Sequence, residues 1–382
     1  MPSRFRVEII SGWAAFEPRW RRLDLGAPSP FQTPGFLRTW YGAFTRLPQV
    51  EPLLVAVSDL ASGEDLALLP LIRHRQGWLT AITFADLWVV DSTAPLLAPS
   101  CPADAQSAME MWAEIRQALP PADLIQFAKM LPEINGKPNP LGLLPGIRLS
   151  PFTRHVLRFD VPWEQHLRVF DKHSRKELGR SRRMFEAAGD GRFWMADTLV
   201  QARTILAAIG AFQRRRFENA GIRHVFDGEA HTQFYRALAE TAASILPLDR
   251  TALLSALELN GEIVAGMLSI TDGKAVTLLR IGNRGGELAR IGLGRLVIER
   301  TISALSMRGI RTFDFSIGEG TVKKLFRAAP EPLVELRQAL TWRGQAAVTA
   351  EQARSTLSQS PLGGVIKARL RSARASKEQG AA

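Results

Sequence analysis

The chain has 382 residues, of which 46% are hydrophobic and 23% charged, and its formal net charge is +12. This length predicts two domains, and the apolar content is sufficient for two cores. The one cysteine, Cys101, excludes an intrachain disulfide and favours a reducing compartment. No apolar run approaches the roughly 18 residues of a membrane span, and the N-terminus lacks a signal-peptide core. The sequence therefore predicts a cytoplasmic protein.

The positive charge is concentrated in the second half of the chain. Residues 1–150 carry a net charge of −1, residues 151–345 carry +9 and residues 346–382 carry +4. We expect these ranges to be an N-terminal lobe, a C-terminal lobe and a basic tail. A positive lobe attracts anionic ligands, such as a CoA phosphate, an acidic glycan, tRNA or an anionic membrane surface. Charge alone does not choose among them, although we do not expect DNA.

The first half predicts strands and helices in alternating blocks. Residues 7–25 are typical of a strand and then a helix, followed by helix 35–44, strands 53–57 and 66–73, helix 105–119 and strand 124–127. Residues 131–150 are rich in Pro and Gly and have few periodic apolar residues, so they predict a linker.

The second half repeats that order, which favours tandem copies of one fold. The expected strands are 153–159 and 193–195, and the expected helices are 163–170, 174–188, 199–217 and 231–244. Three apolar runs then follow, separated by Asn260-Gly261 and Asp272-Gly273. These dipeptides supply the positive φ of tight hairpin turns and predict an antiparallel meander. A helix begins near Gly292, and strand 312–316 comes after it.

The start of that helix is a candidate anion site. Its first turn exposes unpaired N–H groups and the positive end of the helix dipole. Gly292 and Gly294 would let a phosphate approach the backbone next to Leu293. Arg290 and Arg295 flank the turn and add charge. The alternative is that the glycines only form a tight turn.

Carboxylates and lysines follow the last predicted strand. Alternation directs Asp314 away from its two phenylalanine neighbours, so it can face a cleft and act as a general base or orient the acceptor. Glu319 lies in a glycine-flanked loop at the end of the strand and is a second catalytic candidate. Lys323 and Lys324 are candidates for binding a carboxylate or phosphate of the substrate. The alternatives are a structural ion pair for Asp314 and ordinary surface lysines.

Two further basic segments could contact substrate. Residues 172–183 contain six Lys/Arg, including Arg175, and a second run of arginines ends at Arg216. Solvated helix surface is the alternative for both segments. The six histidines lack metal-ligand spacing and one cysteine cannot build a zinc site, so no metal is expected. Neither a Gly-x-Ser-x-Gly elbow nor a Gly-Lys-Ser/Thr phosphate loop occurs.

Several short motifs recur in the order of a known family. They are SPFQTP at 29–34, LLPL at 68–71, SRKELGRSRR at 174–183, RF at 216–217, GEIVA at 261–265, FDF at 313–315, GE at 318–319 and KK at 323–324. In order and spacing over most of the chain, the sequence resembles GNAT-superfamily acetyltransferase-like proteins of the CelD (cellulose biosynthesis) type, which are related to FemAB-like transferases.

The resemblance implies a mixed α/β (α+β) fold of tandem GNAT-like lobes, each a mixed, mostly antiparallel sheet flanked by helices. It also implies an N- or O-acyltransferase that uses acetyl-CoA or another acyl-CoA, with a small-molecule or glycan acceptor from cell-envelope biosynthesis. The thioester would lie against a splayed strand around Leu279 and Ile281, and the pyrophosphate on residues 290–295. The acceptor would attack directly, and the N-terminal lobe would be non-catalytic.

The resemblance leaves the acyl donor open. The family's pyrophosphate loop is usually Arg/Gln-x-x-Gly-x-Gly/Ala, but here Ala289 occupies the first position and Arg290 follows it. FemAB-like relatives use aminoacyl-tRNA, which is one alternative. The other is a non-catalytic protein that binds glycans in envelope biosynthesis.

Overall fold

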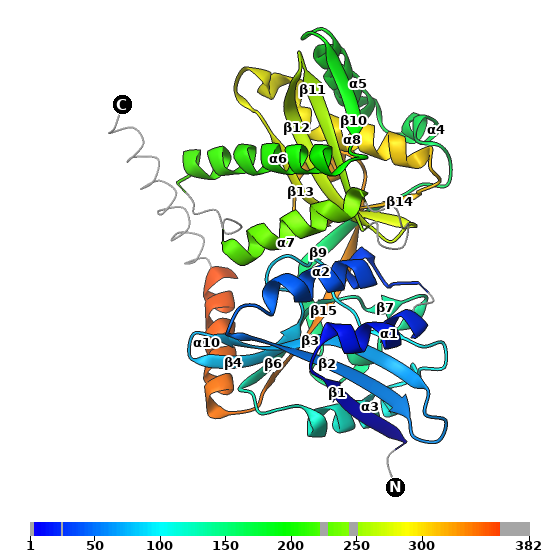
Figure 1. Cartoon of the computed structure of the whole chain (residues 1–382), viewed down its shortest axis with the longest axis vertical. Helices are drawn as coiled ribbons and strands as arrows, with labels where there is room; N and C mark the ends of the chain where they lie inside the picture. The colour runs from blue at the N-terminus through cyan, green and yellow to red at the C-terminus, as the bar shows by residue number, and fades with distance from the viewer. Residues whose placement is uncertain (1–3, 24–25, 222–227, 244–250, 360–382) are drawn as a thin grey trace.

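The protein consists of two lobes stacked along its long axis, in a computed structural model (Figure 1). The structure describes residues 4–23, 26–221, 228–243 and 251–359. The N-terminal lobe is the lower one in Figure 1, and the C-terminal lobe lies above it.

The N-terminal lobe runs strand, two helices, three-stranded meander, helix, strand. Its main elements are β1 (Phe5–Ile10), α1 (Trp13–Leu23), α2 (Pro34–Phe44), β2 (Val50–Asp59), β3 (Asp65–Gln76), β4 (Leu79–Phe84), α3 (Ala105–Ala118) and β6 (Leu124–Met130). Short strands β5 (Leu96–Leu97), β7 (Glu133–Ile134) and β8 (Lys137–Pro138) and the 3₁₀ turns Pro30–Gln32 and Pro140–Leu143 complete it.

The C-terminal lobe follows the same order. Its elements are β10 (Gly191–Met195), α6 (Leu199–Asn219), α7 (Glu229–Glu240), β11 (Ala252–Leu259), β12 (Glu262–Thr271), β13 (Ala275–Asn283), α8 (Leu293–Ser306) and β14 (Thr312–Ile317). The antiparallel meander β11–β12–β13 confirms the prediction from the turn dipeptides, since Asn260 and Gly261 both have positive φ.

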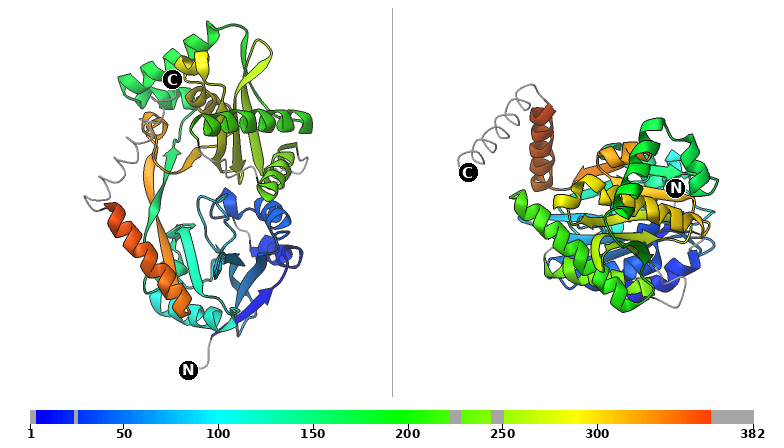
Figure 2. Two further views of the ribbon diagram at one scale, coloured as in Figure 1. Left: turned by 90° about the vertical axis from the view of Figure 1, so that its left-hand side faces the viewer. Right: turned by 90° about the horizontal axis from the view of Figure 1, so that it is seen from above.

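The remaining elements link the lobes or extend them. They are β9 (Arg148–Arg158), α4 (Trp163–His166), α5 (Lys172–Glu186), α9 (Thr321–Leu325), β15 (Ala329–Ala339) and α10 (Trp342–Gln359), with 3₁₀ turns at Leu167–Val169, Thr241–Ala243 and Gly286–Ile291. α10 lies along the side of the N-terminal lobe (Figures 1 and 2). Most of the basic tail, residues 360–382, lies outside the described residues.

The two lobes exchange one strand each, and this exchange makes a single sheet. Its order is β1-β2-β3-β4-β6-β15-β9-β14-β13-β12-β11-β10. β9 follows the N-terminal lobe in the chain but pairs with β14, whereas β15 follows β14 but pairs with β6. β9 and β15 also pair with each other, so they run between the lobes side by side (Figure 2).

The segment predicted as a linker is packed structure. Residues 131–150 contain β7, β8, a 3₁₀ turn and the start of β9, and Ile134 and Leu141 are buried in it. Pro and Gly here form tight turns against the core. The predicted linker at 131–150 therefore contains short strands and a 3₁₀ turn that its composition did not reveal, because turn-rich composition does not distinguish a packed connection from a flexible one.

Helices cover the sheet on two faces. On one face α1, α2, α6 and α7 share a core that runs through both lobes, and Phe36 and Phe44 of α2 contact Phe234 of α7. On the other face α3 packs in the N-terminal lobe, and α5 and α8 pack in the C-terminal lobe. α6 packs closely on β13, where a Cβ at Gly282 would lie 3.0 Å from the Ile209 carbonyl oxygen. Among the described residues, no helix has the length and apolar character needed to cross a bilayer.

A buried ion pair joins α5 to α8. Glu299 is fully buried, accepts from Trp163 Nε1 at 3.0 Å and from Arg182 Nε at 3.2 Å, and is salt-bridged to the same guanidinium. Burial of a carboxylate is tolerated only where such donors replace water. Arg182, part of the basic run predicted from sequence, therefore holds α5 against the helix that begins at Gly292.

We predict that Arg182→Ala destabilises the protein by about 3 kcal/mol, because the substitution leaves a buried carboxylate without its cation. Arg175→Ala, on the exposed side of the same helix, should change stability by no more than about 0.5 kcal/mol. Urea unfolding of both variants measures the difference. Equal midpoints for the two would contradict a structural role of the Arg182–Glu299 pair.

Candidate active site

In the C-terminal lobe, the strands β13 and β14 separate after a short parallel pairing. They pair only from Ala275 with Thr312 to Thr277 with Asp314. The register of β13 against β12 then shifts at Leu279, which is the extra residue of a β-bulge. A bulge breaks the ladder and re-aims side chains. The structure thus places Leu279 and Ile281, the predicted acyl-binding residues, on the part of β13 that is not paired to β14.

In the N-terminal lobe, the parallel strands β4 and β6 also separate after a short pairing, but there another segment of the chain lies beside β6. β4 and β6 also pair in parallel over three residues. Beyond that point Thr93 lies beside β6: its N–H donates to Lys129 O at 2.8 Å, and its carbonyl accepts from Leu131 N at 3.0 Å. A segment of the chain thus lies beside β6 where β4 and β6 have separated.

The glycine segment between β13 and α8 forms a tight turn that opens the helix. Gly285, Gly286 and Gly292 have φ of 64°, 60° and 74°, a region that favours glycine. Gly292 caps α8 without a side chain, and the first bond of the helix runs from Leu296 N to Gly292 O. The N–H groups of the first turn, including Leu293 and Gly294, therefore point out of the helix start. This arrangement suits an anion.

The two flanking arginines differ in their surroundings. Arg295 donates from Nε to Ser181 Oγ at 2.6 Å and lies 3.2 Å from Glu177 Oε2, both on α5. Arg290 is exposed in the turn before Gly292. Arg295 thus ties the helix start to α5, and Arg290 is the flanking cation that faces solvent.

The end of β14 gathers carboxylates from both lobes. Asp314, 6% exposed, accepts from Ser316 N at 2.7 Å and lies 3.6 Å from Arg154 Nη1 of β9. Ser316 has φ of 68°, and its hydroxyl donates to Asp91 of the N-terminal lobe. A left-handed non-glycine residue is a strained position that its surroundings must hold in place. Here the bonds to Asp314 and Asp91 hold it.

The lysine and glutamate after β14 lie at the same end of the strand. Lys323 Nζ donates to Ser316 O at 2.7 Å and to Ile317 O at 2.8 Å. Glu319, largely exposed, lies 3.8 Å from His155 Nε2. The structure therefore brings Asp314, Glu319 and Lys323 together at one place.

Burial shifts the proton affinities of this cluster. It raises the pKa of Asp314 to about 6, although Arg154 opposes the shift, and it raises the pKa of Asp91 above its ordinary value. Burial also lowers the pKa of Lys323, while the nearby carboxylates oppose that change. Perturbed carboxylates beside a cation are typical of functional sites.

The structure leaves three of the predicted substrate contacts outside this cluster. Arg175, Arg216 and Lys324 are all exposed on their helices. Lys324 follows Lys323 directly but points to solvent. Within the described part of the chain, no set of three or more His, Cys, Asp or Glu side chains is arranged to hold a metal ion.

Sequence reasoning missed the residues that come from distant strands and loops. Asp91 lies in the loop after β4, a loop in which Leu87 and Trp88 have positive φ. Arg280 follows the bulge of β13. The run Asp91-Ser92-Thr93 among apolar residues was the available signal for a buried polar loop. Nothing in the sequence tells that this loop meets β14.

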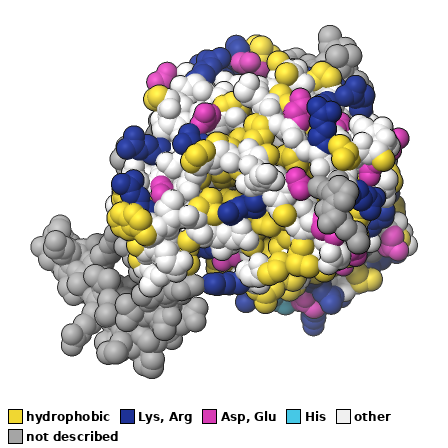
Figure 3. Space-filling view, turned by 90° about the horizontal axis from the view of Figure 1, so that it is seen from below, with side chains coloured by type: hydrophobic (Ala, Val, Ile, Leu, Met, Phe, Trp, Pro, Cys, Tyr) yellow, Lys and Arg dark blue, Asp and Glu magenta, His cyan; other side chains and the backbone are white. Residues whose placement is uncertain are grey.

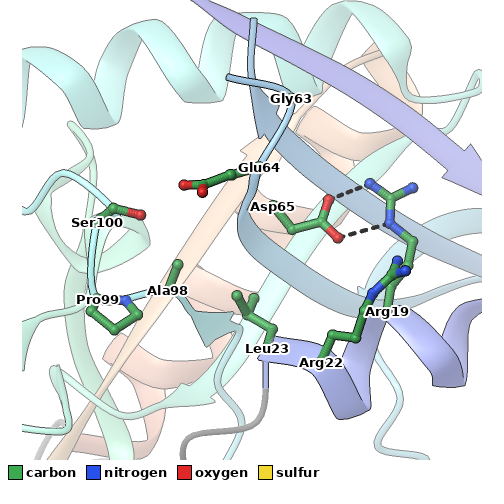
Figure 4. A pocket seen from close by; sticks show the side chains of 9 residues that line it. All are labelled: Arg19, Arg22, Leu23, Gly63, Glu64, Asp65, Ala98, Pro99 and Ser100. Atoms are coloured by element: carbon green, nitrogen blue, oxygen red, sulfur yellow. Dashed lines mark hydrogen bonds and ion pairs between the residues drawn. The ribbon is translucent and has the colours of Figure 1, made fainter. Parts of the chain in front are cut away.

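A pocket in the N-terminal lobe has a different character. It lies between α1 and the β2–β3 turn, with a volume of about 470 Å³, and Arg19 forms a salt bridge with Asp65 across it (Figure 4). Glu8 also accepts from Arg19, at 2.6 Å, so this cation is neutralised by its neighbours. At this end of the molecule basic and acidic side chains are interspersed (Figure 3). The pocket gives no sign of a charged ligand.

The match to a protein-family model lies mainly in the C-terminal lobe. Residues 172–324 match the family model described as the acetyltransferase (GNAT) domain. This match spans α5 to α9, and so includes the bulge, the glycine turn and Asp314, Glu319 and Lys323, whereas Asp91 and Arg154 lie outside it. No curated protein matches the chain significantly.

Solved structures show the same fold at low sequence identity. FemX is 12% identical over 90% of this chain and 99% of its own, with a TM-score of 0.59. The C-terminal domain of a protein described as a lysylphosphatidylglycerol synthetase from Agrobacterium fabrum is 12% identical over 92% of this chain and 98% of its own, with a TM-score of 0.53. A Bacteroides thetaiotaomicron protein of unknown function is 10% identical over 88% and 100%, with a TM-score of 0.52.

The matched domain and the repeated element order define a mixed α/β protein of tandem GNAT-like lobes, as the resemblance implied. The match to the acetyltransferase (GNAT) domain covers residues 172–324, which is less than half of the chain. The particular reaction is a separate question.

We predict that Asp314→Asn changes how stability depends on pH. The folded-state pKa of about 6 exceeds the ordinary value, so the folded protein binds this proton more tightly, and its contribution is lost as pH rises from about 4 through 6. Relative to wild type, the variant should therefore gain up to about 3 kcal/mol between pH 4 and pH 7. Urea unfolding across that range measures it, with exposed Asp160→Asn as the control. A difference in the free energy of unfolding between Asp314→Asn and wild type that does not change with pH would refute the raised pKa of Asp314.

Proposed function

We propose that the protein is an acyl-CoA-dependent N- or O-acyltransferase whose active site lies where β13 and β14 separate. One observation carries the proposal: in the region that matches the GNAT acetyltransferase domain, a strand with a bulge leads directly into a glycine turn and a helix N-terminus without a side-chain cap. An extended thioester with a pyrophosphate at one end needs this combination.

The donor would lie along the unpaired part of β13. Its pyrophosphate would bind the N–H groups of Leu293, Gly294 and Arg295, with Arg290 adding charge from the turn. The bulge at Leu279 frees backbone groups on the side away from β12, and these would polarise the thioester carbonyl. Ile281, which packs towards α8, would line the acyl or pantetheine path.

The chemistry needs one group that accepts a proton. An acceptor amine or hydroxyl attacks the thioester carbonyl, its proton passes to a carboxylate, the C–S bond breaks, and the CoA thiolate leaves and takes up a proton. Asp91 suits this role, since it is only partly exposed, its pKa is raised, and it already accepts from Ser316. Asp314 would position Ser316, and Glu319 and Lys323 would contact the acceptor side of the site.

The remaining predictions of function stay proposals. We propose that residues 1–150 form an N-terminal lobe that binds no donor and supplies only Asp91 to the reaction, that residues 151–345 form the catalytic lobe, and that residues 346–382 form a basic tail. The closure of the first lobe by Thr93 supports this division of labour. A glycan or envelope-precursor acceptor, as in the CelD-type resemblance, and a cytoplasmic location remain predictions.

Calorimetric titration with acetyl-CoA and longer acyl-CoAs tests the donor site. We expect binding of the nucleic-acid-free protein, and at least about tenfold weaker binding by Gly294→Glu, which brings a carboxylate to the helix N-terminus. A Cβ at Gly294 meets only Asn283 Nδ2 at 3.4 Å and Ile281 Cδ1 at 3.9 Å, so the variant should fold. Gly12→Glu makes the same change of charge in open space in the other lobe and should bind normally.

The same titration separates the acyl-CoA reaction from its rival. If no thioester binds, the acyl-CoA proposal is wrong, and aminoacyl-tRNA becomes the donor to test. That donor would be accompanied by copurifying RNA and by binding that weakens steeply with salt. If the protein binds neither acyl-CoA nor aminoacyl-tRNA, the result would favour a non-catalytic glycan-binding protein.

We predict that Asp91→Asn lowers turnover by about a hundredfold or more and leaves donor affinity unchanged. Asn can still accept from the Ser316 hydroxyl, so the turn at Ser316 should persist. Thiol release from the bound thioester, with hydroxylamine as a stand-in acceptor, measures turnover, and Asp160→Asn is the matched control. Turnover equal to wild type would exclude Asp91 as the proton acceptor.

A further inference from the structure

The motif SPFQTP at residues 29–34 builds two consecutive helix starts. Ser29 caps the 3₁₀ turn Pro30–Gln32, and Thr33 caps α2, each by accepting a backbone hydrogen bond at its side-chain oxygen. A proline follows each cap at the first helical position, where its missing N–H costs little. Capping therefore accounts for both hydroxyl residues and both prolines, and leaves the phenylalanine and the glutamine of the motif to be explained.

The phenylalanine of the motif packs against the second lobe. Phe31 is 1% exposed and belongs to the core that runs through both lobes. Leu268 of β12 belongs to the same core, and Leu279 of the β13 bulge packs against it. The turn Pro30–Gln32 contacts both of these strands. A motif of the first lobe therefore lies against the strand that is proposed to carry the thioester.

The glutamine of the motif reaches the loop after β4. Gln32 is 3% exposed, its Nε2 donates to Ser92 O at 3.1 Å, and its Oε1 accepts from Ser29 Oγ at 2.6 Å. Ser29 Oγ also lies 3.3 Å from Ser92 Oγ. Since the one hydroxyl proton of Ser29 is directed to Gln32, Ser92 is the donor in that second pair. Two hydrogen bonds thus join Ser92, which is 1% exposed, to the motif.

The neighbours of Ser92 in the chain are bound by two other elements. Thr93 N donates to Lys129 O of β6 at 2.8 Å. Asp91 accepts from the hydroxyl of Ser316, which lies in β14 of the second lobe. Residues 91–93 are therefore held by three separate elements, and the motif is the one in the middle.

The amide of Gln32 is fixed before it meets the loop. Its backbone carbonyl accepts from Trp20 Nε1 at 3.1 Å, and Ser29 holds its side-chain oxygen. Burial of an amide is unfavourable unless its polar atoms are hydrogen-bonded. These bonds offset the cost of burial and direct the remaining N–H donor at Ser92 O.

We propose that Gln32 is a positioning residue that fixes Asp91 relative to the bulged strand β13. This inference rests on the proposed function, in which Asp91 accepts the proton of the attacking amine or hydroxyl, and deepens it by assigning the position of that carboxylate to one amide. Phe31 sets the motif against β13, and Gln32 sets the Asp91 loop against the motif. A displacement of about 1 Å at a reacting group can cost about a hundredfold in rate.

Turnover and donor affinity of Gln32→Met test this role, because Met keeps the size of the side chain and removes its N–H donor. We expect kcat, measured as thiol release with hydroxylamine as acceptor, to fall about tenfold or more, and the calorimetric affinity for acetyl-CoA to equal that of wild type. Thr33→Val is the matched control. It removes the neighbouring buried hydroxyl, which caps α2, and should lower stability while it leaves kcat unchanged.

Hydrogen exchange at the Thr93 amide shows whether Gln32 holds the loop. Loss of the buried hydrogen bond to Ser92 should raise this exchange about tenfold in Gln32→Met, and Thr33→Val should not raise it. Exchange equal to wild type in Gln32→Met would overturn the inference. So would a kcat equal to wild type, or a loss of acetyl-CoA affinity as large as the loss of kcat, since the role of Gln32 would then be structural only.

Ser29→Ala is a second variant, which decides the question if Gln32→Met does not fold. It removes the hydroxyl that holds the Gln32 amide and should change kcat and exchange in the same direction. The losses in the double variant should be less than additive, because the two side chains act as one unit, and additive losses would contradict that unit. Absence of acyl transfer in wild type would overturn the proposed function and the positioning role with it. An active enzyme whose kcat and exchange do not respond to these substitutions would overturn this inference alone.

Discussion

The exchange of β9 and β15 is the constraint on which the rest of the molecule depends. Each strand leaves its own lobe and completes the other, so the two lobes share backbone hydrogen bonds instead of a side-chain interface alone. Arg154 of β9 contacts Glu331 of β15 at 2.6 Å as well as Asp314, which ties the crossing to the site. A carboxylate of the first lobe can then meet β14 of the second at a fixed distance.

The two lobes solve the same geometric problem in opposite ways. In both, the parallel pair separates after three residues, and the strand then passes through a left-handed non-glycine residue, Lys129 in β6 and Ser316 in β14. In the first lobe, Thr93 lies beside β6 where the strands have separated. Lys129 there forms an ion pair with Asp86, with 2.7 Å between Nζ and Oδ2. The second lobe surrounds it with titratable groups. Two lobes with the same order of elements therefore differ in what lies where their parallel strands separate.

Local sequence features predicted most of the helices and strands of the fold. Asn260-Gly261 and Asp272-Gly273 specify hairpin turns by their backbone preferences, and apolar periodicity located the helices that cover the sheet. The strand exchange was not predictable, because β9 and β15 obey the same local rules whichever lobe they join. For the same reason Asp314 could be singled out on its strand, whereas Asp91 and Arg280 depend on a long-range contact and on a one-residue bulge that alternation does not reveal.

The proposed active site would need residues of both lobes. In the proposed site, β13 carries the bulge at its middle and leads at its end into the glycine turn that opens α8. Asp91 of the first lobe lies at the end of β14, where it accepts from the Ser316 hydroxyl. Under the proposed function, a second lobe isolated from residues 1–150 would keep the glycine turn and lose Asp91. The two lobes would then differ in what they supply to the reaction, because the first contributes Asp91 and the second contributes the glycine turn.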